Sequence, residues 1–519
     1  GLMFTTIPIG DKPFVSPYFS VGREICKNLY IEQSPSETAK VPYYAIRIPG
    51  FLARWRQTSV ASSGCRGIFS TSDGRTFAVN GTTLWELYKG GTRTARATLQ
   101  SIPDASGKYG PVRFAENGSQ VCIVDGNYGY ILELQTSAVS VITDDYFPGG
   151  ASGSLAPTHV KCRDTYFLVN QPLSSKYFWS TPYYIPQPID PLDPSTNHVW
   201  NGLQFGQKIG DTDNITAMEA TSNLLFLFGR NSTEVHYDTG EVNQQLWARM
   251  PNAIIQMGIA SPDAHAEYQG IIYWLGSDRN GTVGVFGCSS DFQPKRVSTR
   301  GVEQIFQSFP KYDDCRAYSY AQAGHAFIVF QFPTADRTFC YDTVTGAWHE
   351  RTYLDRMTGL EHVWRGEWHS ENWGMNIFGD PLTDAYYSLD VSTHSNENPD
   401  GVGVNYIKWV KTTPIGFKDG RNVRYKSLQV MMQQGNGTTL NTDEGVGQDP
   451  SIMVAYSNDS GKTWSQERIV KTGRQGKYAF RSRLCMLGTS RNRVWRISGS
   501  DPVETILVGL LIDGDVLAR

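Results

Sequence analysis

Apolar and polar residues alternate along most of this chain in short runs that end at turn-forming residues. Residues 75–88 (RTFAVNGTTLWELY) place one alternating run on each side of Asn80-Gly81, and residues 116–134 repeat the scheme. Alternation with a period of two is typical of half-buried strands, and Asn-Gly is a strong hairpin signal. A helical period is clear over residues 302–309 (VEQIFQSF) and almost nowhere else. The pattern predicts an all-β chain.

The spacing of the hairpins distinguishes among all-β architectures. From about residue 60 to residue 390, the strongest hairpins recur at intervals that fit the roughly 40 to 50 residues of a propeller blade. Residues 338–351 (TFCYDTVTGAWHER) resemble the edge of a kelch-like blade, in which a Thr-Gly turn leads into a strand opened by a tryptophan. The length of the region predicts a β-propeller of about six blades.

A different pattern begins near residues 391–404 (VSTHSNENPDGVGV), which are polar, contain Pro and Gly, and lack periodicity. This composition predicts a linker or long loop. About six short strands follow, enough for a sandwich of two sheets. We therefore expect an N-terminal arm and propeller entry (1–50), a β-propeller (51–395) and a C-terminal β-sandwich-like domain (396–519).

Composition and charge narrow the function classes. The 519 residues include 51 Gly and only 19% charged residues, which suits short strands joined by tight turns. The formal net charge of -3 gives no global attraction to nucleic acid or to an anionic membrane, so any basic surface must be local. The longest apolar runs are far shorter than the roughly 20 residues that span a bilayer, and we expect no membrane insertion.

Several cofactor and targeting signals are missing from the sequence. Eight cysteines stand singly without a CxxC pair, so we expect buried structural thiols in a reducing compartment and no zinc or dithiol site. No GxxxxGK[ST] phosphate loop occurs. The first residues lack a charged segment followed by an apolar core, so no signal peptide is expected. We expect no cofactor and no metal.

Residues 457–467 (SNDSGKTWSQE) match the pattern SxDxGxTW of the Asp box that sialidases and related propeller enzymes carry. Turn formation alone also explains these residues. Asp and Asn side chains accept hydrogen bonds from nearby backbone N–H groups, Gly adopts a positive φ, and Thr and Trp begin the returning strand. We predict a structural hairpin in the C-terminal domain. Its residues are Ser457, Asp459, Gly461, Thr463 and Trp464.

A catalytic sialidase would need a Tyr nucleophile and arginines that bind a substrate carboxylate. No local spacing in this sequence identifies such a set, and the nearest second copy of the box, residues 71–77 (TSDGRTF), is one residue short. One turn motif carries no mechanism by itself. We therefore expect no enzymatic activity, and a sialidase-like or glycan-binding propeller remains the alternative.

Residues 361–373 (EHVWRGEWHSENW) interleave two histidines and three glutamates with three tryptophans. Imidazole and carboxylate groups could bind a metal, but a helical metal site would place two His four residues apart. The spacing favours a Trp-rich hairpin with exposed aromatic side chains at an interface. The predicted interface residues are Trp364, Trp368 and Trp373.

A run of basic residues near the C-terminus contains no acidic residue from position 471 to position 500. Such a strip could contact DNA phosphates without reading sequence, or it could face solvent or a partner protein. We predict that it contacts double-stranded DNA non-specifically or contacts a partner. Its residues are Lys471, Arg474, Lys477, Arg481, Arg483, Arg491, Arg493 and Arg496.

Stretches along nearly the whole chain, taken in order, resemble one protein family. The longest is residues 456–513, and it is joined by residues 228–241 (FGRNSTEVHYDTGE), 254–264 (IIQMGIASPDA) and 378–390 (FGDPLTDAYYSLD). Residues 44–51 (YAIRIPGF) and the pair Arg66-Gly67 stand where that family opens its first blade. The chain resembles the packaged-DNA stabilisation proteins of short-tailed bacteriophages, which are also called tail hub or head-completion proteins.

This resemblance implies a structural role rather than a catalytic one. It implies a propeller with an added β domain and a hexameric ring of copies beneath the portal and adaptor proteins. It further implies docking of a tail needle and of tailspike or fibre proteins. The implied protein closes the head after packaging, retains the DNA and later passes it during ejection. Its implied location is the virion tail, after assembly in the host cytoplasm.

Overall fold

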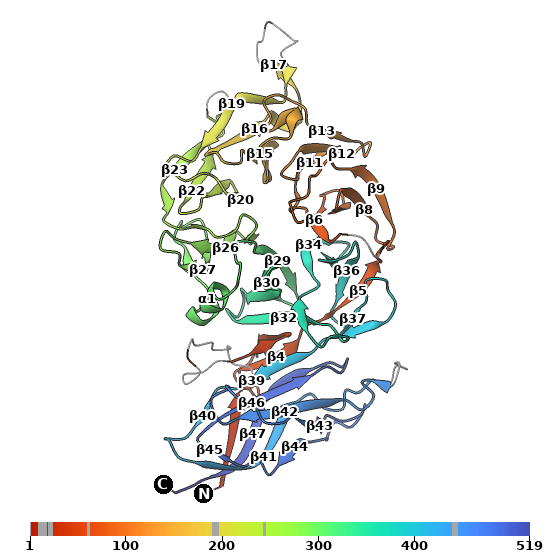
Figure 1. The fold of residues 1–519 in the computed structure, drawn as a ribbon, viewed down its shortest axis with the longest axis vertical. Helices are drawn as coiled ribbons and strands as arrows, with labels where there is room; N and C mark the ends of the chain where they lie inside the picture. The colour runs from red at the N-terminus through yellow and green to blue at the C-terminus, as the bar shows by residue number, and fades with distance from the viewer. Residues whose placement is uncertain are drawn as a thin grey trace.

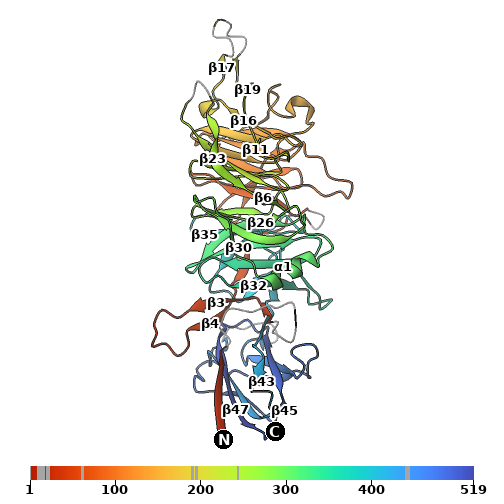
Figure 2. The same cartoon turned by 90° about the vertical axis from the view of Figure 1, so that its left-hand side faces the viewer.

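The structure, a computed structural model, describes residues 2–8, 18, 24–59, 63–188, 192, 197–241, 245–438 and 445–518. A ring of sheets forms one end of the molecule, and two facing sheets form the other end, where both termini lie (Figure 1). Seen after a quarter turn, the molecule is narrower and the two parts remain stacked end to end (Figure 2). The all-β prediction, with a propeller and a C-terminal sandwich, is confirmed.

The ring consists of antiparallel sheets, each formed largely by one local stretch of chain. The first four sheets in chain order are β6–β9 (Cys65–Ser70, Thr76–Asn80, Thr83–Leu87, Arg93–Thr98), β10–β13 (Arg113–Glu116, Gln120–Val124, Gly129–Glu133, Val139–Val141), β14–β16 with β19 (Val160–Arg163, Tyr166–Asn170, Lys176–Ser180, Trp200–Gln207) and β20–β23 (Ala217–Thr221, Leu224–Phe228, Thr233–Asp238, Trp247–Ile255).

Three more sheets complete the ring. They are β24–β28 (Gly258–Ile259, His265–Tyr268, Ile271–Ser277, Val283–Cys288, Lys295–Arg296), β29–β32 (Arg316–Gln322, His325–Phe332, Arg337–Asp342, Trp348–Leu354) and β34–β36 with β5 (Glu367–Asn372, Met375–Gly379, Tyr386–Asp390, Gly50–Trp55). The described sheets are thus seven, against the approximate expectation of six from length. The last sheet takes its fourth strand from the N-terminal segment, and this pairing of β5 with β36 closes the ring.

The place of a strand within its blade explains which of its residues are apolar. The second strand of a blade lies between neighbouring blades, so both of its faces are covered. In β7, β15, β21 and β30 every residue is buried. Such strands become continuous apolar runs, as in LLFLF of β21, because a strand covered on both faces has no polar side.

The sandwich packs two sheets around a separate core. One sheet has the order β3-β4-β47-β41-β44, with β1 beside β47 and β45 beside β41. The strands are β1 (Leu2–Pro8), β3 (Leu29–Gln33), β4 (Tyr43–Arg47), β41 (Val423–Met432), β44 (Ser482–Cys485), β45 (Thr489–Ser490) and β47 (Ile506–Val516). The segment expected to be an arm, 1–50, therefore contributes three strands to this sheet.

The second sandwich sheet is continuous with a propeller blade. Strand β2 (Cys26–Lys27) pairs with β32 of the propeller on one side and with β39 on the other, and the order continues β39-β46-β42-β43. The strands are β39 (Trp409–Thr412), β40 (Gly416–Phe417), β42 (Ser451–Ser457), β43 (Arg468–Lys471) and β46 (Asn492–Gly499). Backbone hydrogen bonds therefore join the two parts of the molecule.

The expected linker at 391–404 folds differently from the prediction. It contributes to a hairpin of β37 (Ser395–Glu397) and β38 (Val404–Tyr406) that packs on β5. The backbone N–H of Phe51 donates to Asn396 Oδ1 at 3.1 Å, and that of Ala53 donates to Glu397 Oε2 at 2.7 Å. Polar residues that lack periodicity here serve as acceptors for the ring-closing strand.

Small elements complete the described chain. They are the 3-10 turns Gly150–Ser152 and Pro182–Tyr184, the strands β17 (Gln187–Pro188), β18 (Asn197–His198) and β33 (Glu361–Val363), and the helix α1 (Arg300–Gln307). Thr299 caps α1 by accepting a hydrogen bond from the N–H of Val302. No helix among the described residues is long and apolar enough to cross a membrane.

Candidate functional site

The five Asp-box residues form one turn that connects β42 to the segment before β43. Ser457 Oγ donates to Asp459 Oδ1 at 2.6 Å and accepts from the N–H of Gly461 at 2.8 Å. The N–H of Thr463 donates to Asp459 Oδ1 at 2.8 Å, and its hydroxyl donates to Asp459 Oδ2 at 2.5 Å. Gly461 has a φ of 97°, a left-handed conformation that favours glycine. The polar groups of the box are thus used within the turn itself.

Replacing Asp459 with alanine is expected to lower the melting temperature of the protein by a few degrees, because the turn loses its cap. Hydrogen bonds from Ser457 and Thr463 hold the pKa of the Asp459 carboxyl well below its ordinary value. The carboxylate therefore stabilises the fold above its unfolded pKa of about 4, and this contribution is lost as the pH falls. Thermal melts at pH 7 and pH 3 of the wild type and the variant test this, and an unchanged melt with lost assembly would contradict it.

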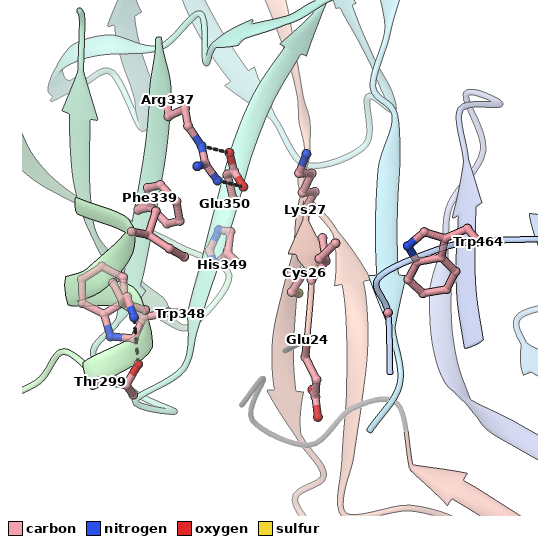
Figure 3. A pocket seen from close by; sticks show the side chains of 14 residues that line it. Glu24, Cys26, Lys27, Thr299, Arg337, Phe339, Trp348, His349, Glu350 and Trp464 are labelled. Atoms are coloured by element: carbon pink, nitrogen blue, oxygen red, sulfur yellow. Dashed lines mark hydrogen bonds and ion pairs between the residues drawn. The ribbon is translucent and has the colours of Figure 1, made fainter. Parts of the chain in front are cut away.

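The box lies beside a cavity between the propeller and the sandwich. Gly461 and Trp464 line this space of about 330 Å³ together with residues of α1, β31, β32 and β2. Figure 3 shows Trp348, Phe339 and the Arg337–Glu350 pair on the propeller side, facing Cys26 and Lys27 of β2. Arg337 Nε donates to Glu350 Oε1 at 2.8 Å. The hairpin thus belongs to the junction between the two parts.

Side chains reinforce this junction. Lys27 Nζ pairs with Glu361 Oε2 of β33 at 2.7 Å. The Asn28 amide donates to Thr352 Oγ1 of β32 at 3.1 Å and accepts from the N–H of Thr352 at 2.9 Å. On the sandwich side, Lys411 Nζ and Glu24 Oε2 form a buried pair at 3.3 Å. Strand β2 is thus held on both edges by backbone and side-chain contacts.

A buried histidine adds a titratable contact. His325, at the start of β30, contacts Asp342 Oδ2 through Nδ1 and Glu32 Oε2 of β3 through Nε2, both at 2.6 Å. Burial alone would lower the pKa of His325, but hydrogen bonds to these two carboxylates outweigh burial and raise the pKa to about 8. The imidazolium therefore bridges the propeller and the sandwich at neutral pH.

Stability is expected to fall as the pH rises through about 8, because the raised pKa means that the folded state holds a proton that the unfolded chain releases near pH 6.5. The contribution is complete below about pH 6.5 and lost above pH 8. Thermal melts from pH 6 to pH 9 should show the gap between wild type and His325→Gln narrowing. His362→Gln, which removes an exposed pair with Asp336, is the control. A gap that stays constant with pH would contradict the bridge.

The predicted basic strip is mostly at the surface. Six of its eight residues are exposed: Lys471, Arg474, Lys477, Arg481, Arg483 and Arg491. Lys471 and Arg474 approach Asp449 Oδ2 at 3.4 and 3.9 Å. Arg496 is half-buried, pairs with Glu467 at 3.3 Å, and stacks over Trp464 at 4.5 Å.

Arg493 does not belong to the exposed strip, and the prediction is wrong for this residue. Its exposed fraction is 1%, and its guanidinium lies 4.5 Å from the ring centre of Tyr425 and 4.0 Å from that of Tyr456. Its NH1 donates to the carbonyl of Leu487 at 2.7 Å. Arg493 is a core residue between the two sandwich sheets and is not available to DNA or a partner.

The predicted interface tryptophans also lie inside the molecule. Trp364 is 1% exposed and Trp368 is 6% exposed, while Trp373 is half-buried against the same core. Trp364 packs on Phe51 at 5.1 Å between ring centres. The prediction of exposed anchors is wrong for Trp364 and Trp368, because Phe51 of the closing strand β5 covers Trp364, and the guanidinium of Arg113 lies 4.8 Å from the ring centre of Trp368.

The arginines on the first strands of blades are used within the chain. Arg113 of β10 pairs with Asp263 at 2.6 Å, and Arg316 of β29 pairs with Glu367. A sialidase needs arginines that remain available to a substrate carboxylate. Among the described residues, no group of three or more His, Cys, Asp or Glu side chains is placed to hold a metal ion.

The junction residues were not identified from the sequence. Glu32, His325 and Lys27 carry no motif, and β2 has two residues. Their partners lie roughly 300 positions away along the chain. A local pattern cannot reveal such a contact.

Among solved structures, the chain is similar to several at low identity. U3-55K matches at 11% identity and a TM-score of 0.38, covering 63% of this chain and 95% of that one. The RRP9 WD40 repeats match at 10% and 0.37, covering 66% and 99%. The extracellular domain of BT4673 from B. thetaiotaomicron matches at 8% and 0.42, covering 86% and 57%. A search of curated proteins gives no match.

Two family models match successive parts of the chain. The model described as bacteriophage P22 Gp10, beta-propeller, matches residues 23–394, and the model described as bacteriophage P22 Gp10, beta-sandwich, matches residues 408–514. Their order agrees with the ring and the two facing sheets in Figure 1. The chain therefore belongs to the bacteriophage P22 Gp10 family, the phage packaged-DNA stabilisation proteins.

Proposed function

We propose that this chain is a hub of the virion tail that closes the portal-adaptor channel, retains packaged DNA and later passes it during ejection. The observation that carries the proposal is the match of both family models, in order, across the propeller and the sandwich. Family membership makes the chain a phage structural protein. The hub role, its partners and its place in the tail are what we add.

The junction supports a mechanical role. A propeller is stiff because its radial sheets bury their faces against one another. Here the outer strand β32 continues through β2 into the sandwich sheet, so backbone hydrogen bonds cross the boundary. A plug against pressurised DNA needs such stiffness in each copy. A flexible linker between the parts would transmit little force.

The proposed partners are further copies of the chain in a hexameric ring, the portal-adaptor proteins, the tail needle, and tailspike or fibre proteins. The exposed basic residues of the sandwich supply charge for non-specific contact with packaged DNA or with a partner. Assembly in the host cytoplasm precedes incorporation into the tail. We propose no catalytic step, and incubation with sialosides is expected to release no sugar.

The proposed function predicts leaky heads when the chain is missing. Particles assembled without it should package DNA and then lose it, because the channel below the portal stays open. Nuclease sensitivity of the packaged genome, with and without added purified chain, measures this. Protection should return when the chain is added. Heads that retain nuclease-resistant DNA without the chain would contradict the proposal.

A further inference from the structure

One surface of the sandwich combines exposed apolar side chains with positive charge. Ile469, Tyr478 and Met486 expose 70%, 76% and 89% of their surface. We call the surface formed by them and their basic neighbours the tip face. Its residues are Arg468, Ile469, Lys471, Arg474, Lys477, Tyr478, Arg481, Arg483 and Met486.

The tip face is contiguous although it spans the edges of two sheets. Arg468 NH1 of β43 donates to the carbonyl of Cys485 in β44 at 2.9 Å. Ser482 Oγ donates to the carbonyl of Lys471 at 2.9 Å. These contacts hold β43, β44 and the connection between them side by side. In Figure 1 the two strands lie in the part of the molecule remote from the ring.

Charge is distributed unevenly between the two parts of the chain. Residues 408–519 contain 17 Lys and Arg against 10 Asp and Glu, an excess of seven positive charges. Residues 48–407, which form the propeller part, contain 25 Lys and Arg against 36 Asp and Glu, an excess of eleven negative charges. The net charge of the whole chain is therefore close to zero although its two parts carry opposite net charges: the sandwich is basic and the propeller part is acidic.

The apolar residues of the tip face decide what kind of partner fits. Phosphate contacts require cations and polar groups, and they leave exposed Ile and Met side chains in water. Apolar side chains within a polar rim are typical of a protein interface. The excess of positive charge requires an acidic partner surface. A second copy of this chain provides one, because its propeller part has the opposite charge.

We propose that the tip face docks on the acidic propeller part of the adjacent copy, which places a basic-to-acidic contact at each step of the ring. Such a contact joins two different surfaces of the same chain, and heterologous contacts of this kind close into rings when the rotation permits. The inference rests on the proposed ring of the hub. It assigns the basic strip to copy-to-copy contact rather than to DNA.

Cys485 allows a direct test, because it is the exposed cysteine on β44 while the others are buried or half-buried. We would label it with a maleimide-benzophenone reagent and assemble tails from an equal mixture of light and heavy-isotope chains. Irradiation should give light-to-heavy adducts whose second peptide falls within residues 48–407. Cys485→Ser, as control, should give none. Adducts with DNA or with other tail proteins alone, or no chain-to-chain adduct, would overturn the inference.

A mutational test separates this inference from the proposed function. Ile469→Asp with Met486→Asp should reduce incorporation into tails at least tenfold, while Phe417→Asp, at an exposed apolar position of the sandwich outside the tip face, should leave it unchanged. Thermal melts confirm folding of each variant. Normal incorporation of the tip variant would overturn the inference while leaving the hub intact. DNA retention in the absence of the chain would instead overturn the hub.

Discussion

Replacing Trp364 with alanine is expected to destabilise the propeller by about 3–5 kcal/mol, the range for removing a fully buried Trp side chain. Trp364 packs on Phe51 of the closing strand at 5.1 Å and on Phe378 at 5.4 Å, and the guanidinium of Arg351 lies 4.5 Å from its ring centre. Its loss leaves a cavity where the last blade meets the strand that closes the ring. Chemical denaturation measures the change in free energy of unfolding.

Trp373→Ala is the matched control, because this side chain is half-buried at the edge of the same cluster. Its effect should be clearly smaller than that of Trp364→Ala. If Trp364→Ala unfolded like the wild type and yet failed to assemble into tails, Trp364 would be an interface residue after all. The core assignment would then be wrong.

Replacing Arg493 with alanine is expected to destabilise the sandwich by about 3 kcal/mol, because a buried side chain and its cation–π contacts are removed together. The guanidinium stacks on Tyr425, Tyr456 and Trp495, at 4.5, 4.0 and 5.1 Å from the ring centres. Arg491→Ala, two positions away and exposed, should change stability by no more than about 0.5 kcal/mol. Equal effects at the two positions would contradict the structural role of Arg493.

Local pattern was sufficient to predict the fold class. Alternating runs became strands, Gly at turns took positive φ, as in Gly81 with a φ of 53°, and the short helical period became α1. These features depend on residues close in sequence. The Asp box is the clearest example, since Ser457 and Asp459 complete their hydrogen bonds within six residues.

The burial of Trp368 could not be predicted, because it depends on an irregularity in one strand. The pairing of β34 with β35 shifts register between Glu367 and His369, and Trp368 has a φ of 57°. Such a bulge breaks the alternation from which a side chain's face is predicted. Trp368 therefore points into the core, where the regular pattern placed an exposed anchor.

Arg493 was misassigned for a related reason. Alternation would put Arg491 and Arg493 on one face of a strand, but β46 begins at Asn492, and alternation does not show which face of this strand is covered. Tyr425 of the opposite sheet covers the face of β46 that carries Arg493, so the arginine is buried between aromatic rings. The junction strand β2 pairs with strands more than 300 residues away, and no local signal encodes such pairing.

We propose that this chain is a stiff building block of the tail and has no catalytic role. Cryo-EM of intact virions is the decisive experiment. We predict a closed ring of copies around the DNA channel below the portal, each copy retaining the continuous sheet through β32, β2 and β39. The proposal is wrong if the chain is absent from the DNA channel below the portal. It is also wrong if the propeller and the sandwich vary in relative orientation between copies.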